Sequence, residues 1–140
     1  MKFLSGLFGR APRQEARAPS EQFPAATDAL AHLLDLHAMT PDSWITLIGE
    51  SRVGTETTIQ LAEDSVNLLT TEVDLPAFME SLGLTALADS TRTGGGPRPD
   101  FTLWTINAAT REELIVLADA LLAQHFGLGA DYTLTGWVES

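Results

Sequence analysis

The sequence predicts an α+β fold with helices packed on an antiparallel-rich sheet, in the element order α-β-β-β-α-β-α-β. One observation is a series of three short β-branched segments with brief connections, which is typical of an antiparallel meander. A second is that the later strand-like segments are separated by stretches of helical period. The composition, 44% hydrophobic and 19% charged, is that of a folded chain, and 140 residues favour one domain.

The domain is expected to span residues 24–140, preceded by a basic apolar tail and linker over residues 1–23. Residues 11–24 contain three prolines and no hydrophobic period, which is typical of a linker. The first helix is predicted over residues 24–39, because Pro24 suits a first turn and leucines recur at helical spacing. Thr40-Pro41 ends it, since a residue before proline avoids helical dihedrals.

Three strands and a second helix are expected next. The strands of the meander are predicted over 43–51, 55–64 and 66–73. Asp74 is a good N-cap for the helix LPAFMESL, and Gly83 ends that helix with Leu84 covering the end. We expect a loose turn at 85–90 and a loop at 91–100, because three glycines and two prolines in that loop support neither helix nor strand.

The last three elements are a strand, a helix and a strand. Residues 100–108 have apolar side chains on both faces, which favours a central strand covered on both sides. Thr110 and Glu113 match a capping box for a helix that extends to Phe126 and ends at Gly127-Leu128. The final strand is predicted over residues 131–139.

Charge is unevenly distributed along the chain. Residues 1–19 carry four basic residues against one acidic residue, a net charge of +3, and the rest carries 18 acidic residues against four arginines, a net charge of −14. A body this acidic repels phosphate polymers, so we expect no nucleic-acid partner.

No residue pattern predicts an enzyme, a cofactor or a metal site. The chain has no cysteine, which excludes disulfides and thiolate ligands and fits a reducing, cytoplasmic location. His32 and His37 lie five residues apart and do not share a helix face, and His125 falls in the last turn of a helix. The glycines at 94–96 lack the lysine and the following helix of a phosphate-binding loop.

Between Trp44 and Trp137 the chain carries a meander (SWITLIGES, TTIQLAED, VNLLTTEV), a helix (FMESLGL), an aromatic strand (FTLWTINA) and a long helix (ELIVLADALLAQHFGL). This patterning resembles the YbjN and type III secretion chaperone-like proteins, without signature residues. The resemblance implies a non-enzymatic domain that binds a peptide or another protein, often as a dimer. Such domains place two strands before the last helix, whereas this chain has one strand there and ends in a strand.

The opening segment MKFLSGLFGR is apolar and basic, in front of an acidic body. Its six-residue apolar run is shorter than a secretory signal or a transmembrane span requires. We expect this segment to bind a protein partner. Contact with an anionic membrane is less favoured, because the lipid would repel the acidic body. The remaining alternatives are that the segment folds back on the chain's own acidic body and that it is a loose tail. The candidate partner-binding residues are Phe3, Leu4, Leu7, Phe8 and Arg10.

Three functional hypotheses follow. The first is a cytoplasmic, non-enzymatic protein- or peptide-binding domain, chaperone- or adaptor-like, and a homodimer would favour it. The second is an accessory subunit of a larger assembly, docked through the N-terminal segment. The third is a small enzyme that uses residues such as His37, Asp42 and Arg98, which requires a concave pocket with convergent titratable groups.

Overall fold

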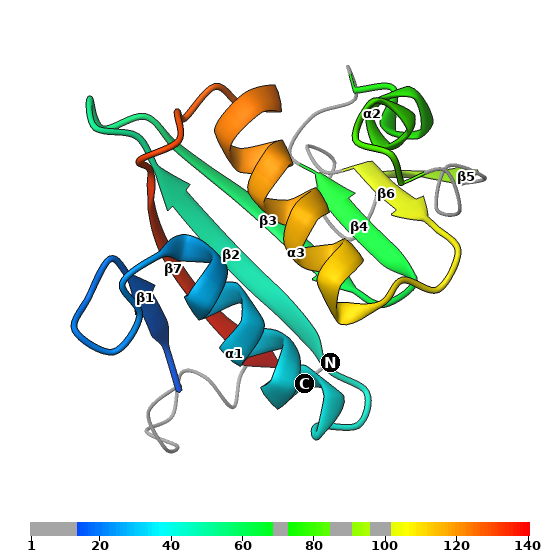
Figure 1. Ribbon diagram of the computed structural model, residues 1–140. Helices are drawn as coiled ribbons and strands as arrows, with labels where there is room; N and C mark the ends of the chain where they lie inside the picture. Colours follow the sequence, from blue (N-terminus) through cyan, green and yellow to red (C-terminus); the bar gives the residue numbers. More distant parts are fainter. Residues whose placement is uncertain (1–13, 69–72, 85–90, 96–101) are drawn as a thin grey trace.

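The computed structural model describes residues 14–68, 73–84, 91–95 and 102–140 (Figure 1). In chain order the elements are β1 (Ala16–Ala18), α1 (Ala26–Ala38), β2 (Trp44–Glu50), β3 (Glu56–Ala62), β4 (Ser65–Leu68), α2 (Leu75–Ser81), β5 (Thr91–Gly95), β6 (Thr102–Thr105), α3 (Arg111–Ala120) and β7 (Thr133–Glu139). The α3 helix continues directly into a π-helical turn, Leu121–His125.

The strands form one seven-stranded sheet in the order β1-β7-β2-β3-β4-β6-β5. Every neighbouring pair is antiparallel. The predicted meander is β2-β3-β4, and β7 pairs with β2 on its other side. The predicted α+β class, with helices on an antiparallel sheet, is therefore confirmed.

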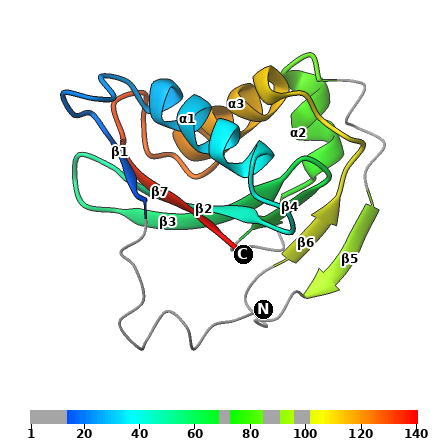
Figure 2. The same ribbon diagram turned by 90° about the horizontal axis from the view of Figure 1, so that it is seen from below.

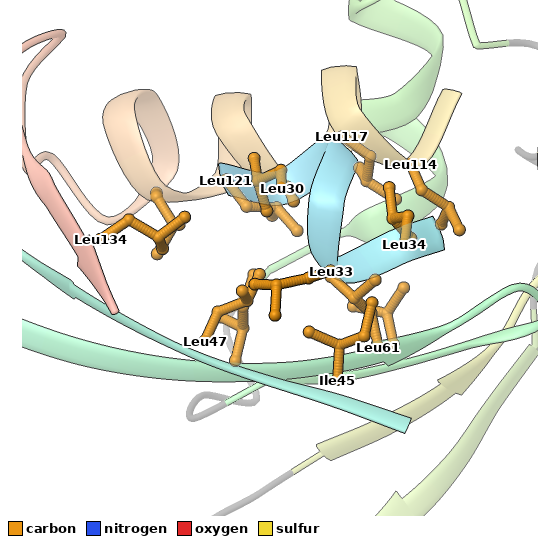
Figure 3. Packing of buried hydrophobic residues seen from close by; sticks show 14 of the residues in the cluster. Leu30, Leu33, Leu34, Ile45, Leu47, Leu61, Leu114, Leu117, Leu121 and Leu134 are labelled. Carbon is orange, nitrogen blue, oxygen red and sulfur yellow. The ribbon is translucent and has the colours of Figure 1, made fainter. Parts of the chain in front are cut away.

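The described helices all lie on the same face of the sheet, as Figure 2 shows. Leucines of α1 and α3 point down onto apolar side chains of β2, β3 and β7 (Figure 3). Leu33 and Leu121 are fully buried there, as are Ile45 and Leu47 on β2. Because successive side chains along a strand point to opposite faces of the sheet, the residues between these core residues face away from the helices.

The predicted ends of α2 and the predicted start of α3 are present. The first helix begins at Ala26, so Pro24 lies before the helix and not in its first turn. Asp74 accepts a hydrogen bond from the Ala77 amide at 3.2 Å, and Gly83 ends α2 with φ +78°. At α3 the Thr110 hydroxyl accepts from the Glu113 amide at 3.2 Å, while the Glu113 carboxylate accepts from the Thr110 amide at 2.9 Å. The π-helical turn that follows α3 is one residue wider than an α-helical turn, since the Phe126 amide donates to the Leu121 carbonyl.

Two predicted irregular segments contain strands instead. The predicted linker 11–24 contains β1, whose Ala16 and Ala18 pair with β7 and are completely buried. The predicted loop 91–100 contains β5, which pairs with β6 with a register shift between Arg92 and Gly95. Both strands lie at sheet edges, so their formation depends on the strand beside them rather than on their own pattern.

The strand predicted over 100–108 is shorter, Thr102–Thr105, and lies one strand in from the edge. The expectation that it is covered on both faces is wrong for the described part of the chain, because the described helices cover one face. The strand predicted over 66–73 begins at Ser65 and is described to Leu68. The turn predicted at 85–90 and the tail residues 1–13 lie outside the described residues.

Candidate functional site

The candidate site is the sheet face opposite the helices, here called the open face. Strand alternation and the pairing register define it. No described helix covers it (Figure 2). On the five strands from β7 to β6 it consists of Thr133, Thr135, Trp137, Glu139, Trp44, Thr46, Ile48, Glu50, Glu56, Thr58, Gln60, Ala62, Ser65, Asn67, Leu103 and Thr105.

A ladder of side-chain hydrogen bonds crosses four strands of the open face. The Asn67 amide Nδ2 donates to Gln60 Oε1 at 3.0 Å, and Gln60 Nε2 donates to Thr46 Oγ1 at 3.1 Å. The Thr46 hydroxyl in turn donates to the Glu139 carboxylate. The polar groups of β4, β3, β2 and β7 are thus joined in one chain.

The ladder ends at an acceptor without a donor. Asn67 is 8% exposed, and its Oδ1 is buried with no hydrogen-bond partner. A buried polar atom without a partner costs about 1–3 kcal/mol relative to a satisfied one. A bound group that donates a hydrogen bond to Asn67 Oδ1 would remove this cost.

A hollow of about 170 Å³ lies beside Asn67. Its walls are largely apolar, with Trp44 from β2 and Leu103 from β6 on either side of β3 and β4. Pockets for drug-sized ligands measure roughly 300–1,000 Å³, so this hollow suits a single side chain. It is lined by Trp44, Gln60, Leu61, Ala62, Ser65, Asn67 and Leu103.

A second hollow, of about 350 Å³, lies at the other end of β2 and β3. Here Glu50 and Glu56 are directly opposite each other on neighbouring strands. Like charges in that position repel. Neither carboxylate forms an ion pair with another described residue, and Arg17 is the one basic residue in the lining. The lining consists of Arg17, Ala18, Pro19, Ile48, Glu50, Glu56, Thr133 and Thr135.

A separate cavity of about 460 Å³ lies at the C-terminal end of α1, away from the open face. His37 joins two other elements there: its Nδ1 lies 2.8 Å from Ser43 Oγ, and its Nε2 lies 2.5 Å from Glu63 Oε2. This hydrogen bond to His37 is the main reason why the pKa of the Glu63 carboxyl is below its usual value. Asp42 also lines the cavity, and its backbone has φ +55°.

A serine, a histidine and a carboxylate that are hydrogen-bonded in this order form the kind of triad that activates a serine nucleophile in enzymes. The Ser43 hydroxyl, however, donates to the Thr40 carbonyl at 2.6 Å, and it lies 3.3 Å from the His37 carbonyl. Its hydrogen thus satisfies a backbone carbonyl just after the C-terminal end of α1, where carbonyl groups lack helical partners. These contacts explain the cluster of Ser43, His37 and Glu63 as a structural feature that caps the C-terminal end of α1.

An ion pair beside this cavity joins the two long helices. Arg111 on α3 donates to both carboxylate oxygens of Asp35 on α1, from Nε at 2.7 Å and from Nη2 at 3.2 Å. Because Asp35 takes up these two donors, Arg111 is not a free cation for a ligand in the cavity.

The structure tests some of the sequence-predicted site residues. Phe3, Leu4, Leu7, Phe8 and Arg10 lie outside the described residues. Of the three residues named for an enzyme, His37 and Asp42 line one cavity, and Arg98 lies outside the described residues.

Sequence reasoning missed all four residues of the ladder as site residues: Asn67, Gln60, Thr46 and Glu139. Alternation along each strand is the signal that places them on one face. Their alignment in a row depends on the register between strands.

The other histidines serve in packing. His32 lies against Phe23 with ring centroids 4.9 Å apart, and His125 packs edge-on against Phe78 and Phe126. Among the described residues, no three histidine, aspartate or glutamate side chains are grouped as metal ligands. Nor does any helix in the described ranges have the length and hydrophobicity to cross a membrane.

No protein-family model, curated protein or solved structure matches this chain.

Proposed function

We propose that this chain is a non-enzymatic protein- or peptide-binding domain, chaperone- or adaptor-like, that binds its partner on the open face. The observation that supports this proposal is the unpartnered Oδ1 of Asn67 beside the hollow between Trp44 and Leu103. A peptide offers both a hydrogen-bond donor and an apolar side chain, so one ligand satisfies the acceptor and fills the hollow. We include a cytoplasmic location in the proposal, because a chain without cysteine needs no oxidising compartment. A homodimer is also part of the proposal.

A second candidate function is an accessory subunit docked through its N-terminal segment. It is supported by the charge contrast between residues 1–19, at +3, and the rest of the chain, at −14. The contacts would come from Phe3, Leu4, Leu7, Phe8 and Arg10, with anionic membrane as the less favoured target and nucleic acid excluded by the acidic body.

The test is to identify a co-purifying native partner, purify it and measure its affinity for defined variants of the full chain. Trp44→Ala and Asn67→Leu alter the open face, and Val116→Ser is the matched control on an exposed position of α3. We expect each open-face variant to weaken binding about tenfold or more, as buried anchor residues do, and the control to bind normally.

Circular dichroism of all variants checks that the fold is kept. Equal affinity of the wild-type protein and both open-face variants would contradict the proposal. An elution mass of twice the monomer in the absence of a partner would support the homodimer.

A further inference from the structure

Building on the proposed function, we infer that the partner of the open face is an extended peptide with a basic residue about six positions from an apolar one. The apolar side chain enters the hollow beside Asn67, and the basic residue lies between Glu50 and Glu56. The contacts that support this assignment lie at the two ends of β2 and β3.

The direction of the ladder determines what the ligand must supply at Asn67. A carboxylate can only accept hydrogen bonds, so Glu139 fixes Thr46 as its donor. Thr46 Oγ1 must then accept from Gln60, and Gln60 Oε1 accepts from Asn67 Nδ2. Asn67 Nδ2 gives one of its two hydrogens to Gln60, and Asn67 Oδ1 can only accept, so a ligand that satisfies Oδ1 must donate a hydrogen bond to it.

The acidic pair determines what the ligand supplies at the other end. Glu50 and Glu56 face each other on adjacent strands, and a cation between them would turn a repulsion into two attractions. An anionic ligand is disfavoured at this end of the open face, because two glutamates line the hollow against one basic residue, Arg17.

The separation of the two hollows sets the spacing within the peptide. Trp44 and Glu50 stand at opposite ends of β2, six residues apart. An extended chain rises by about 3.3 Å per residue, so both ends are reached by a peptide with its two recognition residues about six positions apart. Leu4 and Arg10 of this chain have that spacing, so a synthetic peptide of residues 2–11 is a suitable probe.

The experiment measures fluorescence anisotropy of this labelled peptide with the full chain. We expect saturable binding that weakens about tenfold for Asn67→Leu and for the double variant Glu50→Gln with Glu56→Gln. Glu80→Gln, an exposed acid on α2, is the matched control and should bind like the wild type.

Changes in the peptide test the same assignment. The peptide with Arg10→Glu should not bind the wild-type chain, whereas it should bind the double glutamine variant no more weakly than the unchanged peptide does. The peptide with Leu4→Ser should bind every variant of the chain more weakly than the unchanged peptide. Absence of saturable binding, or binding that ignores both the Asn67 and the glutamate variants, overturns the inference. The proposed function fails separately, when the purified native partner binds Trp44→Ala and Asn67→Leu as well as it binds the wild type.

Discussion

Gly136 shows how closely α1 packs on the sheet. A Cβ atom at this position of β7 would lie 2.6 Å from Leu33 Cδ1, 2.8 Å from Leu47 Cδ2 and 3.2 Å from the Thr46 carbonyl oxygen. Real Cβ atoms do not approach neighbours so closely, so the leucines would have to move. The absence of a side chain at this one residue lets the helix lie directly on the strand.

We therefore expect Gly136→Ala to destabilise the protein by about 1–3 kcal/mol, the usual cost of overpacking a filled core. Urea unfolding measures this, with Thr135→Ala on the open face as the neighbouring control. Equal unfolding free energies for the two variants would show that α1 does not require a glycine there.

Capping and burial at α3 give a second prediction at this scale. Thr110→Ala removes the hydroxyl of the capping box and should cost about 1 kcal/mol. Leu117 is 1% exposed, so Leu117→Ala should lower the free energy of unfolding by an amount on the order of 2–5 kcal/mol. Val116→Ala at a 45% exposed position of the same helix should cost far less. Similar urea melts for all three variants would mean that α3 contributes little to stability.

At the scale of single elements, His37 and Glu63 join the end of α1 to the turn between β3 and β4. The pKa of Glu63 is lowered in the folded protein, chiefly by the hydrogen bond from His37. The stability from this pair is present above the unfolded pKa of about 4.5 and is lost as the pH falls through the lower folded value.

Glu63→Gln should therefore reduce stability at pH 7 and have little effect at pH 3. The expected loss is roughly 0.2–1 kcal/mol, because the carboxylate is largely exposed and solvent screens the pair. Urea melts at the two pH values measure this, with Glu80→Gln on α2 as the exposed control. A loss of the same size at both pH values would exclude a contribution from the ionised Glu63 carboxylate.

The sequence predicted most elements because their signals are local. The capping box at Thr110 and the N-cap at Asp74 need only a few neighbouring residues, and both are present. In contrast, β1 is the tripeptide Ala16–Ala18, too short for a period, and it exists because β7 offers an edge. Asn67 and Glu139 share a ladder for a similar reason, since strands far apart in sequence must align before it forms.

At the scale of the whole molecule, the two faces of the sheet differ in how strongly packing constrains their residues. One face carries the described helices and the core, so its residues are constrained by packing. The open face carries polar and half-buried groups that packing does not require, including the unpartnered Oδ1 of Asn67. If the open face binds the partner as proposed, substitutions on the two faces should separate into effects on stability and effects on binding.

The boundary of the N-terminal segment decides how its role can be tested. The sequence alone predicts that deleting residues 1–19 leaves the fold intact. The structure changes this expectation, because Ala16 and Ala18 are buried in β1 and pair with β7. Deleting residues 1–19 removes that strand and uncovers the edge of β7.

We expect deletion of residues 1–13 to leave the unfolding free energy nearly unchanged and to abolish association with the native partner, if the N-terminal segment is the docking element. Deletion of residues 1–19 should also lower stability by at least about 1 kcal/mol, through the lost backbone hydrogen bonds between β1 and β7 and the core surface that β1 no longer covers. Urea melts and partner binding measure the two effects independently. Normal partner binding by the shorter deletion would contradict N-terminal docking and leave the open face as the binding surface. Flotation with anionic liposomes that depends on residues 1–13 would instead favour a membrane target.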